Sequence, residues 1–201
     1  MTKKIGKLSA IVNFCAVAAF ALCLLTGFLF GSYLTSMFIA FSFVPMICAF
    51  AAHSKLEAKA FGNTAMIFGG MYATFILLVY FVQVTTVRIE GLGAQAMSLL
   101  DYTNFGMFFN LNLLGYGLMS LSTFFIAFTI DASTKADRWL KNLMMIHGVF
   151  AITCFVMPML GVFYRDVQMS EAVGALILGF WCAYFMPVGI LSYNYFKRRF
   201  A

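Results

Sequence analysis

The chain has 201 residues, of which 63% are hydrophobic and 10% are charged, and its formal net charge is +6. A soluble domain usually carries about 25% charged residues, so this chain lacks the polar side chains that would cover a soluble surface. Its mean hydropathy of +0.94 agrees. These values exclude a disordered chain, a nucleic-acid-binding protein and a secreted disulfide scaffold, and they indicate an integral membrane protein.

Apolar stretches without charged residues divide the chain into six predicted membrane-spanning helices. A span needs roughly 20 mostly apolar residues. The stretch from Leu8 to Ser54 is too long for one span, so we place a turn near Gly27, Gly31 and Ser32. The predicted fold is all-α, a single polytopic transmembrane domain over residues 1–201, with spans at about 8–29, 33–53, 63–87, 104–130, 142–164 and 172–196.

Lysine and arginine residues are distributed unequally between the two sets of loops. Eleven belong to one side and only Arg88 and Arg165 to the other. Because these residues collect on cytoplasmic loops, both termini are predicted to face the cytoplasm. No cleavage site follows the first apolar run, so we expect a retained first span rather than a signal peptide. The eleven residues are Lys3, Lys4, Lys7, Lys55, Lys59, Lys135, Arg138, Lys141, Lys197, Arg198 and Arg199.

One internal similarity suggests a repeat. Residues 47–75 align without a gap with residues 125–153, and the pairs include Ala49 with Ala127 and Gly70 with Gly148. A repeated helix–loop–helix unit in the same orientation occurs in some transporters. Chance similarity within a biased alphabet is the alternative.

The longest predicted outer loop covers residues 88–101. Gly91 and Gly93 interrupt the helix before it, and Leu92, Ala96 and Leu99 then follow at helical spacing. This pattern predicts a short amphipathic helix in the outer interface. Two interpretations stay open: a connector that rests on the headgroups, and a lid over a cavity that opens outward.

The span 104–130 is the most polar of the six. Asn112, Tyr116, Ser120 and Thr123 recur at spacings of three or four residues and share one helix face. This face could form interhelical hydrogen bonds, which average about 0.6 kcal/mol in membranes, or it could line a polar cavity. The candidate ligand-binding residues are Tyr80, Gln83, Arg88, Asp101, Asn104, Asn112, Tyr116, Ser120 and Thr123, and Tyr164 could join them.

Ionisable Asp, Glu, Lys and Arg residues are absent from the interior of the predicted spans. Proton-coupled pumps usually keep such a residue at mid-membrane, so a neutral or lipid-like ligand is favoured. We interpret His147 as a hydrogen-bonded structural residue, because a haem or metal site would need further ligands near it. The five cysteines form no Cys-x-x-Cys motif. We therefore predict no cofactor and no metal site.

Two further expectations concern packing. Asp131 follows the fourth span, and Lys135 and Arg138 are its nearest available partners, so it would act as an anchor at the cytoplasmic face. Small residues let membrane helices approach closely. The glycines expected to serve such packing are Gly69, Gly70, Gly115 and Gly117.

The chain resembles uncharacterised six-helix membrane proteins of Gram-positive bacteria. The resemblance rests on the stretches 41–46 (FSFVPM), 79–88 (VYFVQVTTVR) and 114–125 (LGYGLMSLSTFF). It implies a multi-pass protein of the bacterial cytoplasmic membrane and no particular activity. The substrate-binding subunits of energy-coupling-factor vitamin transporters are similar in size and helix number. However, their Ala-x-x-x-Ala docking motif is missing from the first span here.

Three functional hypotheses follow. The leading one is a binding or transport module for a small neutral or lipid-like molecule, in contact with membrane lipids. The second is a non-enzymatic membrane partner, an assembly, immunity or sensory subunit that acts on a protein partner or as a homo-oligomer. The third is a lipid-modifying enzyme with His147, Asp101 or Glu90 as a base. It is weakened because none of the usual catalytic motifs occurs.

Overall fold

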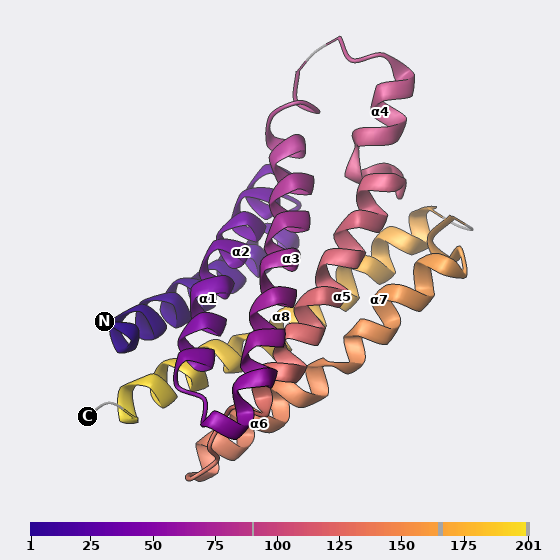
Figure 1. Ribbon diagram of the computed structural model, residues 1–201. Coiled ribbons are helices and arrows are strands. Elements are labelled where there is room, and N and C mark those ends of the chain that lie inside the picture. The colour runs from indigo at the N-terminus through magenta and orange to yellow at the C-terminus, as the bar shows by residue number, and fades with distance from the viewer. Residues whose placement is uncertain (90, 165–166, 200–201) are drawn as a thin grey trace.

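The computed structural model describes the backbone of residues 1–89, 91–164 and 167–199, and the side chains of these residues except 164–173. This part of the chain is helical and contains no strand (Figure 1). The elements in chain order are α1 (Thr2–Leu25), α2 (Leu29–Ala52), η1 (Leu56–Ala58), α3 (Lys59–Val84), α4 (Ala94–Leu100), η2 (Tyr102–Asn104), α5 (Met107–Ala127), α6 (Lys135–His147), α7 (Val149–Met159), η3 (Val162–Tyr164) and α8 (Val167–Arg198).

Six segments of the described chain are long and apolar enough to cross a membrane, which is the architecture of a multi-pass membrane protein. They are α1, α2, Leu56–Val84, α5, Lys135–Met159 and Gly174–Arg198. Both termini lie toward one end of the bundle, which we call the terminal end, together with α6. The short helix α4 lies at the opposite end, which we call the α4 end (Figure 1).

Two predicted local features of the α4 end are confirmed. A tight turn joins α1 to α2, and Gly27 occupies it with a φ of 68°, a conformation that favours glycine. Gly31, which the sequence also placed near the turn, instead lies inside α2. A Cβ atom there would be 2.6 Å from the Cys23 sulfur, so α1 and α2 approach closely. The loop 88–101 contains the expected short helix, α4.

The predicted span 142–164 is interrupted near its start, at Gly148. Helix α6 begins with a capping box in which Thr134 Oγ1 accepts from the Asp137 N–H and Asp137 accepts from the Thr134 N–H. It ends at His147, and α7 begins at Val149. A Cβ atom on the intervening Gly148 would lie 2.9 Å from Phe124 Cβ of α5. The aligned helix of the suggested repeat, α3, has no such interruption, and the repeat stays a prediction.

Helix α5 lies at the centre of the bundle. In its most apolar stretch of 18 residues, 61% of the residues are buried, against 17% in the corresponding stretch of Lys135–Met159. Ser122 Oγ of α5 donates to the Ala65 carbonyl of α3 over 2.7 Å. A Cβ atom on Gly69 would lie 3.1 Å from that same hydroxyl oxygen. Gly115 and Gly117 also lie against neighbouring helices as expected, whereas a Cβ atom on Gly70 would meet nothing within 4 Å.

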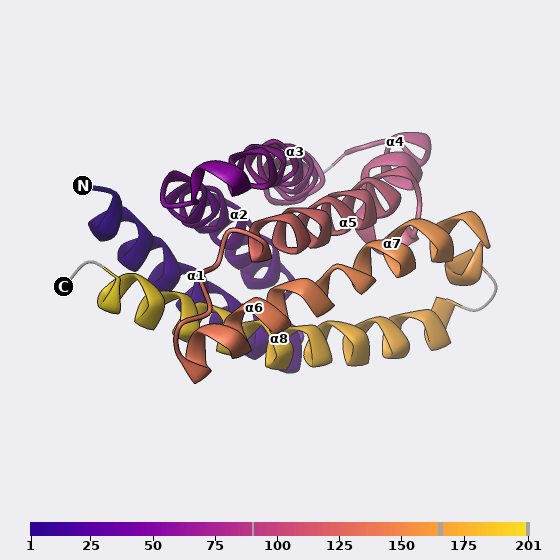
Figure 2. The same ribbon diagram turned by 60° about the horizontal axis from the view of Figure 1, so that its bottom comes forward.

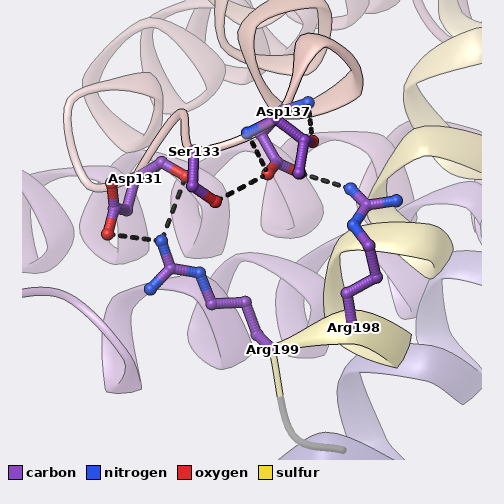
Figure 3. Close-up of polar contacts among 6 residues, drawn as sticks. Asp131, Ser133, Asp137, Arg198 and Arg199 are labelled. Atoms are coloured by element: carbon purple, nitrogen blue, oxygen red, sulfur yellow. Dashed lines mark hydrogen bonds and ion pairs between the residues drawn. The ribbon is translucent and has the colours of Figure 1, made fainter.

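The terminal end is held by two carboxylate–arginine pairs, which we call the terminal lock (Figure 3). The buried Asp137 of α6 pairs with Arg198 of α8. In the α5–α6 loop, Asp131 pairs with Arg199 over 2.5 Å and lies 3.9 Å from Lys55 Nζ. The lock therefore joins the C-terminal end of α8 to the α5–α6 loop and the start of α6.

The partners of Asp131 correct one expectation. The sequence suggested Lys135 and Arg138, which are its near neighbours, but the observed partners are Lys55 and Arg199, which are distant along the chain. The hydrogen bond and the positive charge of Arg199 hold the pKa of Asp131 below its usual value. The predicted role of an anchor remains, and it acts between segments rather than within one helix.

Candidate functional site

A cavity of about 560 Å³ lies between α5, α7 and α8, toward the α4 end of the bundle. Its walls are mostly apolar, and none of the described residues that line it is an Asp, Glu, Lys, Arg or His. The lining residues are Leu24, Gly27, Leu29, Tyr102, Thr103, Phe105, Phe109, Asn112, Leu113, Tyr116, Ser120, Phe150, Cys154, Phe163, Gly174, Ala175, Ile177, Leu178 and Trp181. This size is typical of sites that enclose a small-molecule ligand.

Three residues of the predicted polar face of α5 line this cavity: Asn112, Tyr116 and Ser120. Their spacing of four residues places them on one side of the helix, one turn above another. The helix thus presents a narrow polar row to a chamber that is otherwise apolar. The opposite side of α5 carries Gly115 and Ser122 against α3.

Asn112 stands out among these residues because its side chain is 2% exposed and its Oδ1 atom has no hydrogen-bond partner. A buried amide oxygen without a partner costs free energy, about 1–3 kcal/mol in proteins. Asn112 lies five residues into α5, roughly 8 Å along the helix axis from its first residue. The cavity-lining residue Asn112 therefore holds an enclosed and unused hydrogen-bond acceptor within the membrane-crossing part of the helix.

The Ser120 hydroxyl has no free proton to donate to a ligand in the cavity. It donates to the Tyr116 carbonyl over 2.9 Å. The ring of Tyr116 packs edge-on against Trp181, with ring centroids 5.6 Å apart. Its hydroxyl is buried near Ser36 and Tyr80, without a hydrogen bond of normal geometry. Tyr116 therefore contributes mainly its ring to the cavity wall.

Thr123, the fourth residue of the predicted polar face of α5, does not line the cavity and is hydrogen-bonded to a histidine. His147 Nδ1 lies 2.8 Å from Thr123 Oγ1, and Trp181 Nε1 donates to His147 Nε2 over 3.0 Å. Since Nε2 accepts, the neutral ring carries its proton on Nδ1 and donates it to Thr123. The Thr123 hydroxyl in turn donates to the Ser120 carbonyl over 2.9 Å.

This chain of hydrogen bonds links three helices at the base of the cavity. Trp181 of α8 lines the cavity and reaches His147 at the end of α6, and His147 reaches Thr123 of α5. Both ring nitrogens of His147 are engaged, so binding a metal or haem iron would break one of these bonds. The arrangement is the hydrogen-bonded histidine that the sequence suggested.

Tyr80 belongs to a cluster of aromatic residues beside the cavity. Its ring stacks on Tyr33 of α2 at a centroid distance of 5.4 Å and lies 5.9 Å from Tyr102 of η2. Tyr102 also lines the cavity. Tyr80 itself is absent from the cavity wall, and its ring supports the residues that form it.

Gln83, Asp101 and Asn104 hold the segment that covers the α4 end of the cavity. Gln83 Nε2 donates to the Leu100 carbonyl over 2.8 Å, and its Oε1 accepts from the Tyr102 N–H over 3.1 Å. Asp101 accepts from the backbone and hydroxyl of Thr103. Asn104 donates to the Met97 carbonyl over 3.1 Å. The structure places these three residues in the scaffold of the loop.

Arg88 lies apart from the other predicted site residues. It is exposed, and its guanidinium sits 4.7 Å from the centroid of the Phe30 ring. Glu90, suggested above as a base, lies outside the described residues, as does the side chain of Tyr164.

Sequence reasoning missed the walls contributed by α7 and α8. Phe150 and Cys154 of α7 line the cavity together with Ile177, Leu178 and Trp181 of α8. In the view of Figure 2, α7 is drawn between α5 and α8. A signal was present, because Gly174 and Gly179 leave little side-chain volume in the part of α8 toward the α4 end, and one tryptophan lies within its apolar run. These residues showed no polar pattern, however, and only the polar face of α5 drew attention.

Comparison of the chain with protein-family models, with curated proteins and with solved structures found no match.

Proposed function

We propose that the protein is an integral membrane module that binds or transports a small neutral or lipid-like molecule in the cavity between α5, α7 and α8. The observation that carries the proposal is an apolar cavity of about 560 Å³, with no charged residue among the described residues that line it, beside the unpartnered amide oxygen of the lining residue Asn112. Membrane bundles rarely keep polar residues without a role. A ligand in this cavity would bury apolar surface and satisfy the amide.

The proposed placement is the bacterial cytoplasmic membrane with both termini inside. The support is the asymmetry of lysine and arginine, eleven against two, because these residues favour cytoplasmic loops. In this orientation the cavity lies in the outer half of the bilayer. Reporter fusions at Lys55 and at Gly93 test the orientation, since the first should report a cytoplasmic and the second an external position.

In the same orientation the segment after α4 is the proposed lid. Tyr102, Thr103 and Phe105 line the cavity, and Gln83 clips this segment to α3 through two hydrogen bonds. Two such bonds are few enough to break and remake during ligand exchange, because each contributes roughly 0.5–1.5 kcal/mol net. The lid would open toward the outside.

Native mass spectrometry of gently solubilised protein tests the binding proposal. The wild-type protein should carry a stoichiometric extra mass. Ala175→Phe, which adds a ring to the cavity wall, should reduce the bound fraction strongly. Leu176→Phe is the matched control, because Leu176 is the next residue on α8, is 74% exposed and does not line the cavity.

The control decides how a negative result is understood. Loss of the mass in both variants would point to a general effect on the outer part of α8. An apo wild-type protein after mild extraction from its native membrane would contradict the proposal. In that case the alternative of a membrane partner, acting through helix contacts with another protein, would become the leading hypothesis.

A further inference from the structure

We propose that the ligand is an uncharged amphiphile that is dissolved in the membrane and donates a hydrogen bond from a hydroxyl or amide group to Asn112 Oδ1. Long-chain alcohols, isoprenoid alcohols and monoacylglycerols belong to this chemical class. The inference rests on the proposed function and names the substrate class of the same cavity.

The absence of charge on the described cavity wall excludes charged head groups from its interior. Removing an ionised group from water without a counter-charge is far more costly than burying an amide or a hydroxyl. Asp101, the acidic residue that the described part of the chain places at this end, already accepts two hydrogen bonds from Thr103. A phosphate or an ammonium group would therefore find no partner of opposite charge among the described lining residues.

The hydrogen-bond inventory of the wall favours a donating ligand. Ser120 gives its proton to the Tyr116 carbonyl, Thr103 gives its proton to Asp101, and Trp181 gives its N–H to His147. These three groups have no proton left to offer, and the Tyr116 hydroxyl, which has no hydrogen bond of normal geometry, is buried near Ser36 and Tyr80. Asn112 Oδ1, in contrast, is an acceptor without a partner. This oxygen is enclosed by protein atoms, so a turn of the Asn112 amide would be needed to bring it to the cavity surface, where a ligand hydroxyl would satisfy it.

The walls of the cavity indicate access from the bilayer. Helix α7 packs on α5, and α8 packs on α1 and α6, while α7 and α8 make little contact with each other among the described residues. Outer α8 residues beside the cavity are strongly exposed, with Leu176 at 74% and Phe180 at 63%. Because α7 and α8 both belong to membrane-crossing segments, a space between them faces acyl chains.

Trp181 offers a direct reporter of occupancy. The chain has two tryptophans, and Trp139→Phe leaves Trp181 as the only one. Trp181 lines the cavity and is 4% exposed, so bilayer lipids outside the cavity do not reach it. A bromine atom quenches tryptophan fluorescence over a short range that extends somewhat beyond contact. Quenching of Trp181 beyond the level produced by a brominated phospholipid in the same vesicles therefore means that the chain is inside the cavity.

The experiment uses W139F protein in phospholipid vesicles doped with one of two probes, a long-chain alcohol brominated at mid-chain or its methyl ether. The alcohol should quench Trp181 at a membrane concentration about three- to tenfold lower than the ether, the ratio expected for one net hydrogen bond. Asn112→Leu in the W139F background should reduce this ratio to about one. Thr74→Val, at an exposed position on α3, should leave it unchanged.

The outcomes separate the two proposals. Quenching by neither probe would overturn the proposed function together with this inference. Equal quenching by alcohol and ether would keep the binding cavity and overturn the ligand class. An unchanged ratio in N112L would overturn the role of Asn112. The comparison of the two probes requires no change at Asn112, so it remains decisive even if N112L does not fold.

Discussion

The two sides of α5 differ in how tightly they pack and in whether their polar side chains are hydrogen-bonded. On the side toward α3, Ser122 is fully buried and hydrogen-bonded to Ala65, and Gly69 brings the two helices together. On the side toward α7 and α8, Asn112 has an unpartnered oxygen and borders an open cavity. One helix thus serves as a structural contact on one side and as a binding wall on the other.

This difference shows that polarity within a membrane helix has two distinct meanings. Ser122 is polar because it joins two helices, and nothing is left over for a ligand. Asn112 is polar without any such function in the described structure. A buried polar group identifies a candidate site when its hydrogen bonds are unused and its residue borders a cavity, and the sequence alone contains neither piece of information.

The largest effect on stability is expected when a serine on one side of α5 or the other is replaced by a larger side chain. Ser122→Leu should destabilise the protein by about 3 kcal/mol, because the larger side chain would force α3 away from α5. Ser120→Leu places the same side chain on the cavity side and should cost less than about 1 kcal/mol, since it extends into free space. Reversible unfolding in mixed micelles, followed by circular dichroism, measures both values.

Equal costs for the two serine variants would contradict the proposed difference between the sides of α5. A large cost for Ser120→Leu would mean that the cavity is closed in the native state. A small cost for Ser122→Leu would mean that the contact with α3 is loose.

His147 tests the base of the cavity. Replacing it with Leu leaves the Trp181 N–H and the Thr123 hydroxyl without their partner, and we expect a loss of about 2 kcal/mol in unfolding free energy. The emission of Trp181, recorded in the W139F background, should shift as its N–H loses the acceptor. A variant of wild-type stability would show that this hydrogen-bonded chain is incidental to the packing of α5, α6 and α8.

The terminal lock adds a pH dependence that neither side of α5 supplies. Arg199 lowers the pKa of Asp131 in the folded state. A carboxyl group with a lowered folded pKa stabilises the protein above its unfolded pKa, about 4. That stabilisation is lost as the pH falls through the folded value. Unfolding midpoints measured from neutral pH downward should therefore decline in acid, and Arg199→Gln should flatten this decline.

Tyr116→Phe should produce the smallest effect. The Tyr116 hydroxyl forms no hydrogen bond of normal geometry, so removing it should change stability by no more than about 0.5 kcal/mol. Tyr184→Phe is the matched comparison, because its hydroxyl donates to the Leu143 carbonyl and its loss should cost about 1 kcal/mol. A larger cost at Tyr116 would reveal a partner for its hydroxyl.

Much of the architecture could be predicted because it follows from local chemistry. Apolar length defines six helices, Gly27 marks a turn, and the spacing of Asn112, Tyr116 and Ser120 places them on one face. Interactions between distant segments could not be predicted in the same way. Asp131 pairs with Arg199, 68 residues later, and the walls from α7 and α8 contain no polar pattern.

Most of the predicted site residues fall into two groups, those that line the cavity and those that hold the loop, because only contacts within one helix can be predicted from spacing. Asn112, Tyr116 and Ser120 of α5 line the cavity together because helical geometry is regular, whereas Thr123 of the same row is hydrogen-bonded to His147. Gln83, Asp101 and Asn104 lie at the α4 end as expected, but their hydrogen bonds go to the loop backbone. Which polar side chain faces a cavity and which one holds a loop depends on the path of residues 94–106, and spacing within a single helix does not specify that path.

The most direct test of the cavity as a ligand site is an experimental structure of the protein crystallised from a lipidic mesophase. The account predicts continuous elongated density between α5, α7 and α8, with a polar atom within hydrogen-bonding distance of Asn112 Oδ1. Helices α7 and α8 packed against each other, with Asn112 bonded to another protein group and no space between them, would contradict it.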